Sequence, residues 1–178
     1  MIVSHLHDDH FDNVALQQVP KYLPLFCQPD DAATIRAAGF GNVTPLTGRA
    51  TWEELTLTRR EGSHGLGPVV ELMGSVMGFS REAEGEPSIY WTGDTVLYSP
   101  VENTIRETMP DIIVTHSCGA RWDGDLIVMD AAETITVCGT APDAIVIATR
   151  MEALDHATIS RYDLRDAEMK KALHRPGC

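Results

Sequence analysis

The feature that most constrains this chain is a cluster of histidines and aspartates close to its N-terminus. Residues 4–12 read SHLHDDHFD and follow a short apolar stub that is typical of a strand end. In an extended segment alternate side chains share a face, so we expect His5 and His7 to point the same way. A turn after His7 would bring Asp9 and His10 to the same cavity. Imidazole and carboxylate donors together suit Zn²⁺ or a similar first-row metal, and the plainer alternative is a polar loop with coincidental histidines.

Two further residues of metal-ligating type stand in loops that contain glycine. His64 lies in EGSHGLG, where glycine would let the backbone approach a bound ion closely. Its alternative role is that of a solvent-exposed loop histidine. Asp94 lies in YWTGDT after an expected strand, and its alternative role is that of an ordinary aspartate in a turn. Both residues are candidate metal ligands.

The order of these motifs resembles that of the metallo-β-lactamase superfamily. Members carry a His-x-His-x-Asp-His signature at a strand end, a lone histidine further along and then a Gly-Asp after another strand. The resemblance covers residues 4–95 and implies two neighbouring metal ions with a bridging carboxylate. Transferred to this chain, the implied ligands are His5, His7 and His64 for one ion, Asp9 and His10 for the other, and Asp94 between them.

A looser resemblance extends along the rest of the chain. The segments THSCGAR, MDAAETI and MEALDHATISRYDLR, at residues 115–121, 129–135 and 151–165, are similar to the lactonase-like branch that includes ascorbate-6-phosphate lactonase. This second resemblance is less specific and selects no substrate.

The resemblance breaks after the strand expected at residues 144–149. Superfamily members place their last ligand histidine there, but this chain has Arg150, whose guanidinium stays protonated and offers no lone pair. His156 follows shortly after, and it either reaches the metal instead or lies beside the site without binding it. His116 also follows a strand and is a candidate for lining the site. Arg150 itself, if it faces the cavity, would bind a substrate carboxylate or phosphate bidentately.

Length is the second departure from the superfamily. Members carry several strands before the histidine motif, whereas only residues 1–4 precede it here, and members usually add a closing strand after the final helix. We therefore expect a sandwich that is incomplete at both ends, with unpaired edges and exposed apolar surface that would allow a homo-oligomer. An incomplete gene model, a truncated chain and a degenerate protein would all produce this pattern.

Apolar runs of strand length alternate with helical stretches along the chain. Strands are expected at residues 2–4, 24–28, 42–46, 53–60, 69–79, 88–95, 111–117 and 144–149. Helices are expected at residues 30–40, 98–108, about 130–139 and 160–175, the last with Ser160 as its N-cap. The pattern predicts one layered α/β (α+β) domain over residues 1–178, and the resemblance makes it an αββα sandwich.

Composition disfavours several classes of protein. The chain has 14 Lys plus Arg against 26 Asp plus Glu, and a net charge of −12 disfavours a nucleic-acid partner. No window approaches the roughly 18–20 apolar residues of a membrane span, and the N-terminus lacks the basic region of a secretory signal. We therefore expect a cytoplasmic protein without a membrane partner. The four cysteines form no Cys-x-x-Cys pair and are expected to be reduced and structural, with Cys118 as an alternative nucleophile.

Together these features predict a metal-dependent hydrolase of a small-molecule ester, lactone or phosphoester. The expected cofactor is Zn²⁺, as one or two ions, with Mn²⁺ or Fe²⁺ as alternatives. Two ions about 3.5–4 Å apart would hold the attacking hydroxide, with Asp94 as the bridge and Asp9 as a second catalytic carboxylate. The alternative is a catalytically impaired remnant of the fold, because Arg150 replaces an expected ligand. Oxygen-reducing and nuclease members of the superfamily are disfavoured, since the chain lacks a flavoprotein domain and a basic surface.

Overall fold

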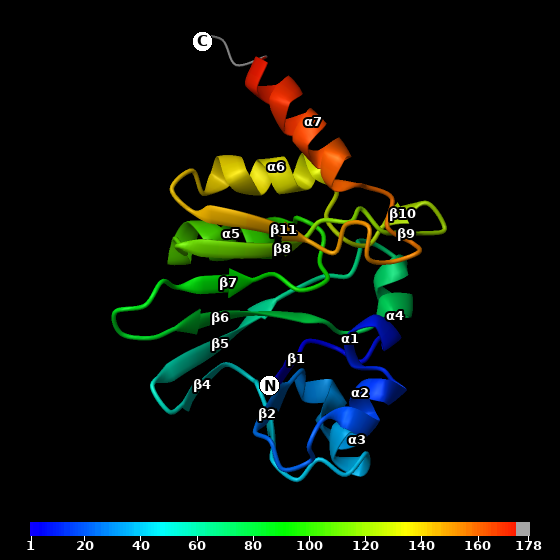
Figure 1. The fold of residues 1–178 in the computed structure, drawn as a ribbon, viewed down its shortest axis with the longest axis vertical. Helices are drawn as coiled ribbons and strands as arrows, with labels where there is room; N and C mark the ends of the chain where they lie inside the picture. The colour runs from blue at the N-terminus through cyan, green and yellow to red at the C-terminus, as the bar shows by residue number, and fades with distance from the viewer. Residues whose placement is uncertain (174–178) are drawn as a thin grey trace.

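The computed structural model describes residues 1–173, and within them the strands form two sheets and a small hairpin (Figure 1). The larger sheet has the strand order β11-β8-β7-β6-β5-β4, antiparallel from β4 to β7 and parallel from β7 to β11. The smaller sheet is parallel, in the order β1-β2-β3. The strands are β1 Ile2–Val3, β2 Leu25–Cys27, β3 Val43–Pro45, β4 Arg49–Trp52, β5 Leu55–Glu61, β6 Met77–Glu82, β7 Ile89–Trp91, β8 Ile112–His116, β9 Arg121–Trp122, β10 Asp125–Leu126 and β11 Ile145–Thr149.

Helices lie at both outer sides of these sheets (Figure 1). They are α1 Asp8–Phe11, α2 Asn13–Gln18, the 3₁₀ turn η1 Pro29–Asp31, α3 Ala32–Ala37, α4 Val69–Met73, α5 Ser99–Thr108, α6 Ala131–Thr140 and α7 Arg161–Leu173. None of these helices has the length and apolar character needed to cross a bilayer.

Buried apolar clusters separate the layers. Helices α1–α3 pack against the smaller sheet in a cluster that includes Ile35. Phe26 and Met77 belong to a second cluster, which lies between the two sheets. Helices α5 and α6 cover the other face of the larger sheet through Ile105 and Val137. The order helix, sheet, sheet, helix confirms the αββα fold class predicted from the sequence.

The strand expected at residues 69–79 is wrong in its first half. Val69–Met73 form helix α4, and strand β6 begins only at Met77. Gly74, with a φ of 73°, ends the helix. Both halves are short and apolar, and for such a run hydrophobic periodicity cannot distinguish a buried helix from a strand. The short helices α1 and α2, strand β4 and the β9–β10 hairpin were not expected either.

The start of the last helix agrees with its expected N-cap. The hydroxyl of Ser160 donates to Asp163 Oδ2 at 2.6 Å, and the backbone N–H of Asp163 donates back to that hydroxyl oxygen at 3.1 Å. The backbone N–H of Ser160 also donates to Asp163 Oδ2, at 2.9 Å, so the backbone N–H groups of both residues have a partner at the start of the helix. Residues 174–175, the expected end of the helix, lie outside the described part of the chain.

Both edges of the larger sheet present apolar side chains to solvent. Strand β11 exposes 64% of Ile145 and 44% of Ile147, and strand β4 exposes 40% of Trp52. An edge strand also leaves backbone N–H and C=O groups without a neighbouring strand. In the single chain these two edges are therefore the least covered parts of the sheet.

Gly93 connects β7 to the loop that carries Asp94, and Gly93→Ala is expected to destabilise the protein. Gly93 has a φ of 72°, and a Cβ atom there would lie 2.7 Å from the carbonyl oxygen of Met77. A left-handed conformation costs other residues about 1–3 kcal/mol, and the backbone clash adds to this. We expect the free energy of unfolding in urea to fall by at least about 2 kcal/mol. Gly85→Ala is the matched control, because Gly85 has a φ of 75° but open space around it; equal losses in the two variants would contradict the argument.

Candidate metal centre

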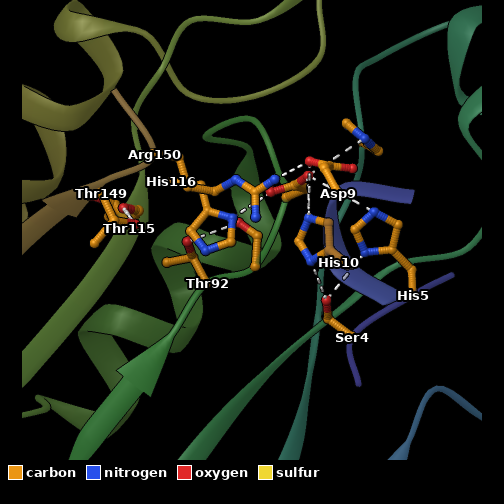
Figure 2. A network of polar contacts seen from close by, with 12 residues as sticks. Ser4, His5, Asp9, His10, Thr92, Thr115, His116, Thr149 and Arg150 are labelled. Atoms are coloured by element: carbon orange, nitrogen blue, oxygen red, sulfur yellow. Dashed lines mark hydrogen bonds and ion pairs between the residues drawn. The ribbon is translucent and has the colours of Figure 1, made fainter. Parts of the chain in front are cut away.

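Side chains from several segments converge where strands of both sheets end (Figure 2). Strands β7, β8 and β11 are parallel, so the segments that follow them meet at the same edge of the sheet. The converging residues are His5 and His7 after β1, Asp9 and His10 on α1, His64 between β5 and α4, Asp94 after β7, His116 at the end of β8, and Arg150 after β11.

Three imidazoles form the first group of candidate ligands. Donor atoms of His5, His7 and His64 lie within 4.8 Å of one another. The ring centroids are 4.4 Å apart for His5 and His7 and 5.1 Å apart for His7 and His64. Nδ1 of His64 lies 2.8 Å from the carbonyl oxygen of Ile127, which accepts its proton and leaves the lone pair on Nε2. That lone pair is therefore available to a metal.

The carboxylate of Asp94 joins this group to a second one. Donor atoms of His5, His10 and Asp94 also lie within 4.8 Å of one another. Asp94 Oδ2 lies 2.9 Å from His10 Nε2 and 3.8 Å from the Nε2 atoms of both His5 and His64. Asp94 is only 4% exposed, so its charge is held away from bulk water and close to four imidazoles.

Ser4 supports two of these imidazoles from behind. Its hydroxyl oxygen lies 3.1 Å from Nδ1 of His5 and 3.4 Å from Nδ1 of His10 (Figure 2). A hydroxyl donates one hydrogen bond and accepts up to two, so it can pair with both rings unless both Nδ1 atoms lack a proton. Partners of this kind fix the orientation of ligand rings. Ser4 and the Ile127 carbonyl were not singled out from the sequence, although Ser4 directly precedes the motif.

Burial and hydrogen bonding determine the charge state of the centre. Burial, together with the neighbouring His10, lowers the pKa of His5 to about 2, so this imidazole is neutral. Burial also lowers the pKa of His64. Burial alone would raise the pKa of Asp94, but hydrogen bonds from His10 and His116 outweigh it and hold that pKa well below its usual value. Neutral imidazoles around an ionised carboxylate are the charge state that metal binding requires.

The two residues expected to bind substrate are hydrogen-bonded to the aspartates. His116 Nδ1 is hydrogen-bonded to Asp94 Oδ1, and the guanidinium of Arg150 forms an ion pair with Asp9 Oδ2 (Figure 2). Asp9 Oδ2 also lies 3.6 Å from His10 Nε2. Both residues nonetheless border a cavity of about 370 Å³ lined by Ile2, Ser4, His10, Phe79, Trp91, His116 and Arg150.

His156 and Cys118 lie differently from the other candidates. The side chain of His156 is 44% exposed, contacts Asp155 at 3.0 Å and belongs to neither ligand group. Cys118 is 1% exposed, and burial raises its pKa, so its sulfur is a protonated thiol rather than a nucleophilic thiolate. These positions give neither residue a contact with the ligand groups.

The donor set fits a divalent transition metal. Nε2 of His5 is fully buried and has no hydrogen-bond partner among the described residues. A buried polar atom without a partner costs stability, and a cation bound by Nε2 would supply the missing interaction. Imidazole nitrogens with one carboxylate are ligands that Zn²⁺, Fe²⁺ and Mn²⁺ accept.

The sequence is similar to curated proteins of one family, although no protein-family model matches it. It is 37% identical over 174 residues to the UPF0173 protein YddR of Bacillus subtilis, covering 96% of this chain and 68% of that protein. It is 30% identical over 124 residues to a UPF0173 metal-dependent hydrolase of Xanthobacter autotrophicus, and the match spans 64% of this chain and about half, 51%, of that protein.

Solved structures agree with this relationship. A possible metal-dependent hydrolase from Veillonella parvula superposes with a TM-score of 0.91 at 32% identity, over 97% of this chain and 70% of that one. An isothiocyanate hydrolase from Delia radicum gut bacteria gives a TM-score of 0.89 at 29% identity, over 96% and 69%. The metallo-β-lactamase-fold protein YhfI of Bacillus subtilis, at 17% identity and a TM-score of 0.68 over 95% and 70%, shares the fold alone. The chain therefore belongs to the UPF0173 family of metal-dependent hydrolases and has the metallo-β-lactamase fold.

Proposed function

We propose that this chain hydrolyses a small-molecule ester, lactone or phosphoester with the help of a divalent metal, most readily zinc. The observation that supports this best is the unpartnered Nε2 of His5, which is buried among other imidazoles and lies 3.8 Å from an ionised carboxylate oxygen of Asp94. In the metal-free protein such a site lowers the free energy of unfolding, because a buried polar atom is left without a hydrogen-bond partner. A bound cation would give that atom a partner and remove this destabilisation.

Each residue of the centre has a role in this proposal. His5, His7 and His64 hold the metal, and Asp94 provides the neighbouring negative charge. A divalent metal bound there lowers the pKa of water and polarises the substrate oxygen. Asp9 accepts a proton from the attacking water at Oδ1, since Oδ2 is paired with Arg150. His156 has no ligand role.

The cavity beside the centre is the proposed substrate site. Its volume of about 370 Å³ falls in the range of small-molecule pockets. One wall is apolar, formed by the rings of Phe79 and Trp91, which stack with centroids 6.1 Å apart. The polar part of the lining consists of His10, His116 and Arg150. A guanidinium has five N–H donors, so Arg150 can bind Asp9 and still donate to an anionic group of the substrate.

The isothiocyanate group is a second candidate substrate. The solved structure that covers 96% of this chain at 29% identity is an isothiocyanate hydrolase. The central carbon of an isothiocyanate is an electrophile that water attacks, as it attacks an ester carbonyl. An apolar wall beside polar groups would suit such a molecule, which has an apolar substituent next to its reacting group.

Removal of metal is expected to abolish hydrolysis, and this tests the proposed function. We expect protein purified with zinc to hydrolyse at least one compound from a panel of 4-nitrophenyl esters, lactones, phosphodiesters and isothiocyanates. Treatment with EDTA should reduce that rate at least about 100-fold, and Zn²⁺, Mn²⁺ or Fe²⁺ should restore it, because no other group in the centre activates water as strongly.

The control for this experiment is the exposed variant Asp143→Asn, which should match the unmodified chain in rate and in sensitivity to EDTA. Turnover that survives complete removal of metal would refute a metal-dependent reaction. Binding of metal without turnover of any compound in the panel would refute the proposed substrate classes and would support the catalytically impaired alternative.

A further inference from the structure

We propose that the centre holds a single metal ion and that the guanidinium of Arg150 takes the place of a second one. The ion would lie on His5, His7 and His64 beside Asp94. The positive charge of Arg150 would neutralise Asp9. This inference rests on the proposed metal-dependent function and specifies how many ions that function uses.

The centre offers too few donor atoms for two ions. The two candidate groups share His5, whose Nδ1 is hydrogen-bonded to Ser4, so only Nε2 is free to bind an ion. An ion on His5, His7 and His64 uses that atom. The second group is then left with His10 and Asp94, which is fewer than the three protein ligands that even an open zinc site uses.

The remaining carboxylate near the second group is already paired with a cation. Asp9 stands beside this second group, with Oδ2 at 3.6 Å from His10 Nε2. The same Oδ2 forms the ion pair with Arg150. A guanidinium is a permanent cation, so the Asp9 carboxylate is neutralised by this contact. The aspartate that would complete a second site therefore already has a cation.

Electrostatic repulsion by Arg150 also disfavours a second ion. Arg150 reaches across from the end of β11 to Asp9, next to His10 (Figure 2). Its side chain is 18% exposed and that of Asp9 is 24% exposed, so water screens the pair only in part. A divalent ion on His10 and Asp9 would sit in direct contact with a fixed positive charge. The first group contains neither His10 nor Asp9, the two residues next to the guanidinium.

The backbone supports this position of Arg150. Arg150 has a φ of 71°, in the left-handed region that residues with a Cβ atom adopt at a cost. Such a conformation persists where the surrounding structure requires it, and it is common at functional sites. Here the residue follows the last strand of the parallel part of the sheet and turns its side chain onto Asp9.

Metal content per chain tests this inference. The full chain is purified with zinc present, freed of loosely bound ions by gel filtration and measured by plasma mass spectrometry. We expect one equivalent of zinc, and a cobalt titration followed by visible absorption should also break at one equivalent. We expect Arg150→His to bind two equivalents, because the new imidazole joins His10, Asp9 and Asp94 and the repulsive charge is gone.

Two further variants keep the test decisive. Arg106→His replaces an exposed arginine that is paired with Glu102 on α5, and it should stay at one equivalent. Arg150→Met removes the charge at similar length, and it should bind more than one equivalent even if Arg150→His does not fold. Two equivalents in the unmodified chain, or one in a folded Arg150→His, would overturn the inference and leave the hydrolase proposal standing. A folded chain without metal would overturn both, whereas one equivalent without any hydrolysis would overturn only the proposed function.

Discussion

Asp94→Asn is expected to lower kcat/KM for hydrolysis by about 10³-fold. The carboxylate of Asp94 is hydrogen-bonded to His10 and His116 and lies 3.8 Å from the Nε2 atoms of His5 and His64. Asparagine keeps the shape but loses the charge, and it turns an N–H₂ group toward one side of this cluster. Removal of one partner of a buried charged pair costs roughly 3–5 kcal/mol, and about 1.4 kcal/mol corresponds to a factor of ten in rate.

The measurement for Asp94→Asn combines steady-state kinetics with metal content. We expect the bound metal to fall as well, since the substitution removes the one buried carboxylate of the two candidate groups. Asp143→Asn makes the same chemical change on the surface and should leave both quantities unchanged. A folded Asp94→Asn variant with full metal content and undiminished kcat/KM would contradict the role proposed for Asp94.

His5→Leu is expected to abolish metal binding while the metal-free protein becomes no less stable. His5 belongs to both candidate groups, so its loss removes a donor from either one. Loss of a group that only orients a ligand costs roughly 10–100-fold in metal affinity, and loss of a ligand should cost more. In the metal-free chain leucine fills similar volume and removes the unpartnered Nε2 atom, which should raise the free energy of unfolding by about 1 kcal/mol.

The response of metal-free His5→Leu to pH gives a second readout. In the folded chain the pKa of His5 is about 2, whereas its ordinary value is 6.5. The unfolded chain therefore binds the proton more tightly, and the metal-free protein loses stability as the pH falls below about 6.5. His5→Leu should weaken this dependence, as followed by urea unfolding with EDTA at several pH values. Metal-free His5→Leu that is much less stable than the unmodified chain at neutral pH would contradict the argument.

Bound metal should also stabilise the unmodified chain against unfolding, but not His5→Leu. A ligand that binds only the folded state stabilises it by about 2.7 kcal/mol when its concentration is 100 times its Kd. We expect zinc to raise the melting temperature of the unmodified chain and to have little effect on His5→Leu. The expected pattern is thus a loss of function with a gain in metal-free stability, which is common where polar groups are buried for function.

Much of the architecture follows from local sequence patterns. The helices at 99–108 and 131–140 and the strands that pair in the parallel part of the sheet lie close to where apolar periodicity predicts them. Ser160 and Asp163 form their hydrogen bonds within one turn, so neighbouring residues determine where α7 starts and the sequence can predict it. The strand predicted at residues 69–73 was wrong because a short apolar helix and a buried strand have similar composition, and only tertiary packing distinguishes them.

The sequence by itself determined which chemistry the centre offers. The spacing of His5, His7 and His10 in one motif predicted a metal site, because side chains so close along the chain cannot separate far in space. Only the tertiary structure decided how the distant residues pair. The contact of Arg150 with Asp9 joins residues 141 positions apart, and the contact of His116 with Asp94 depends on two parallel strands ending at one edge. Sequence spacing does not predict such contacts, because they arise from the packing of the two sheets rather than from any local pattern.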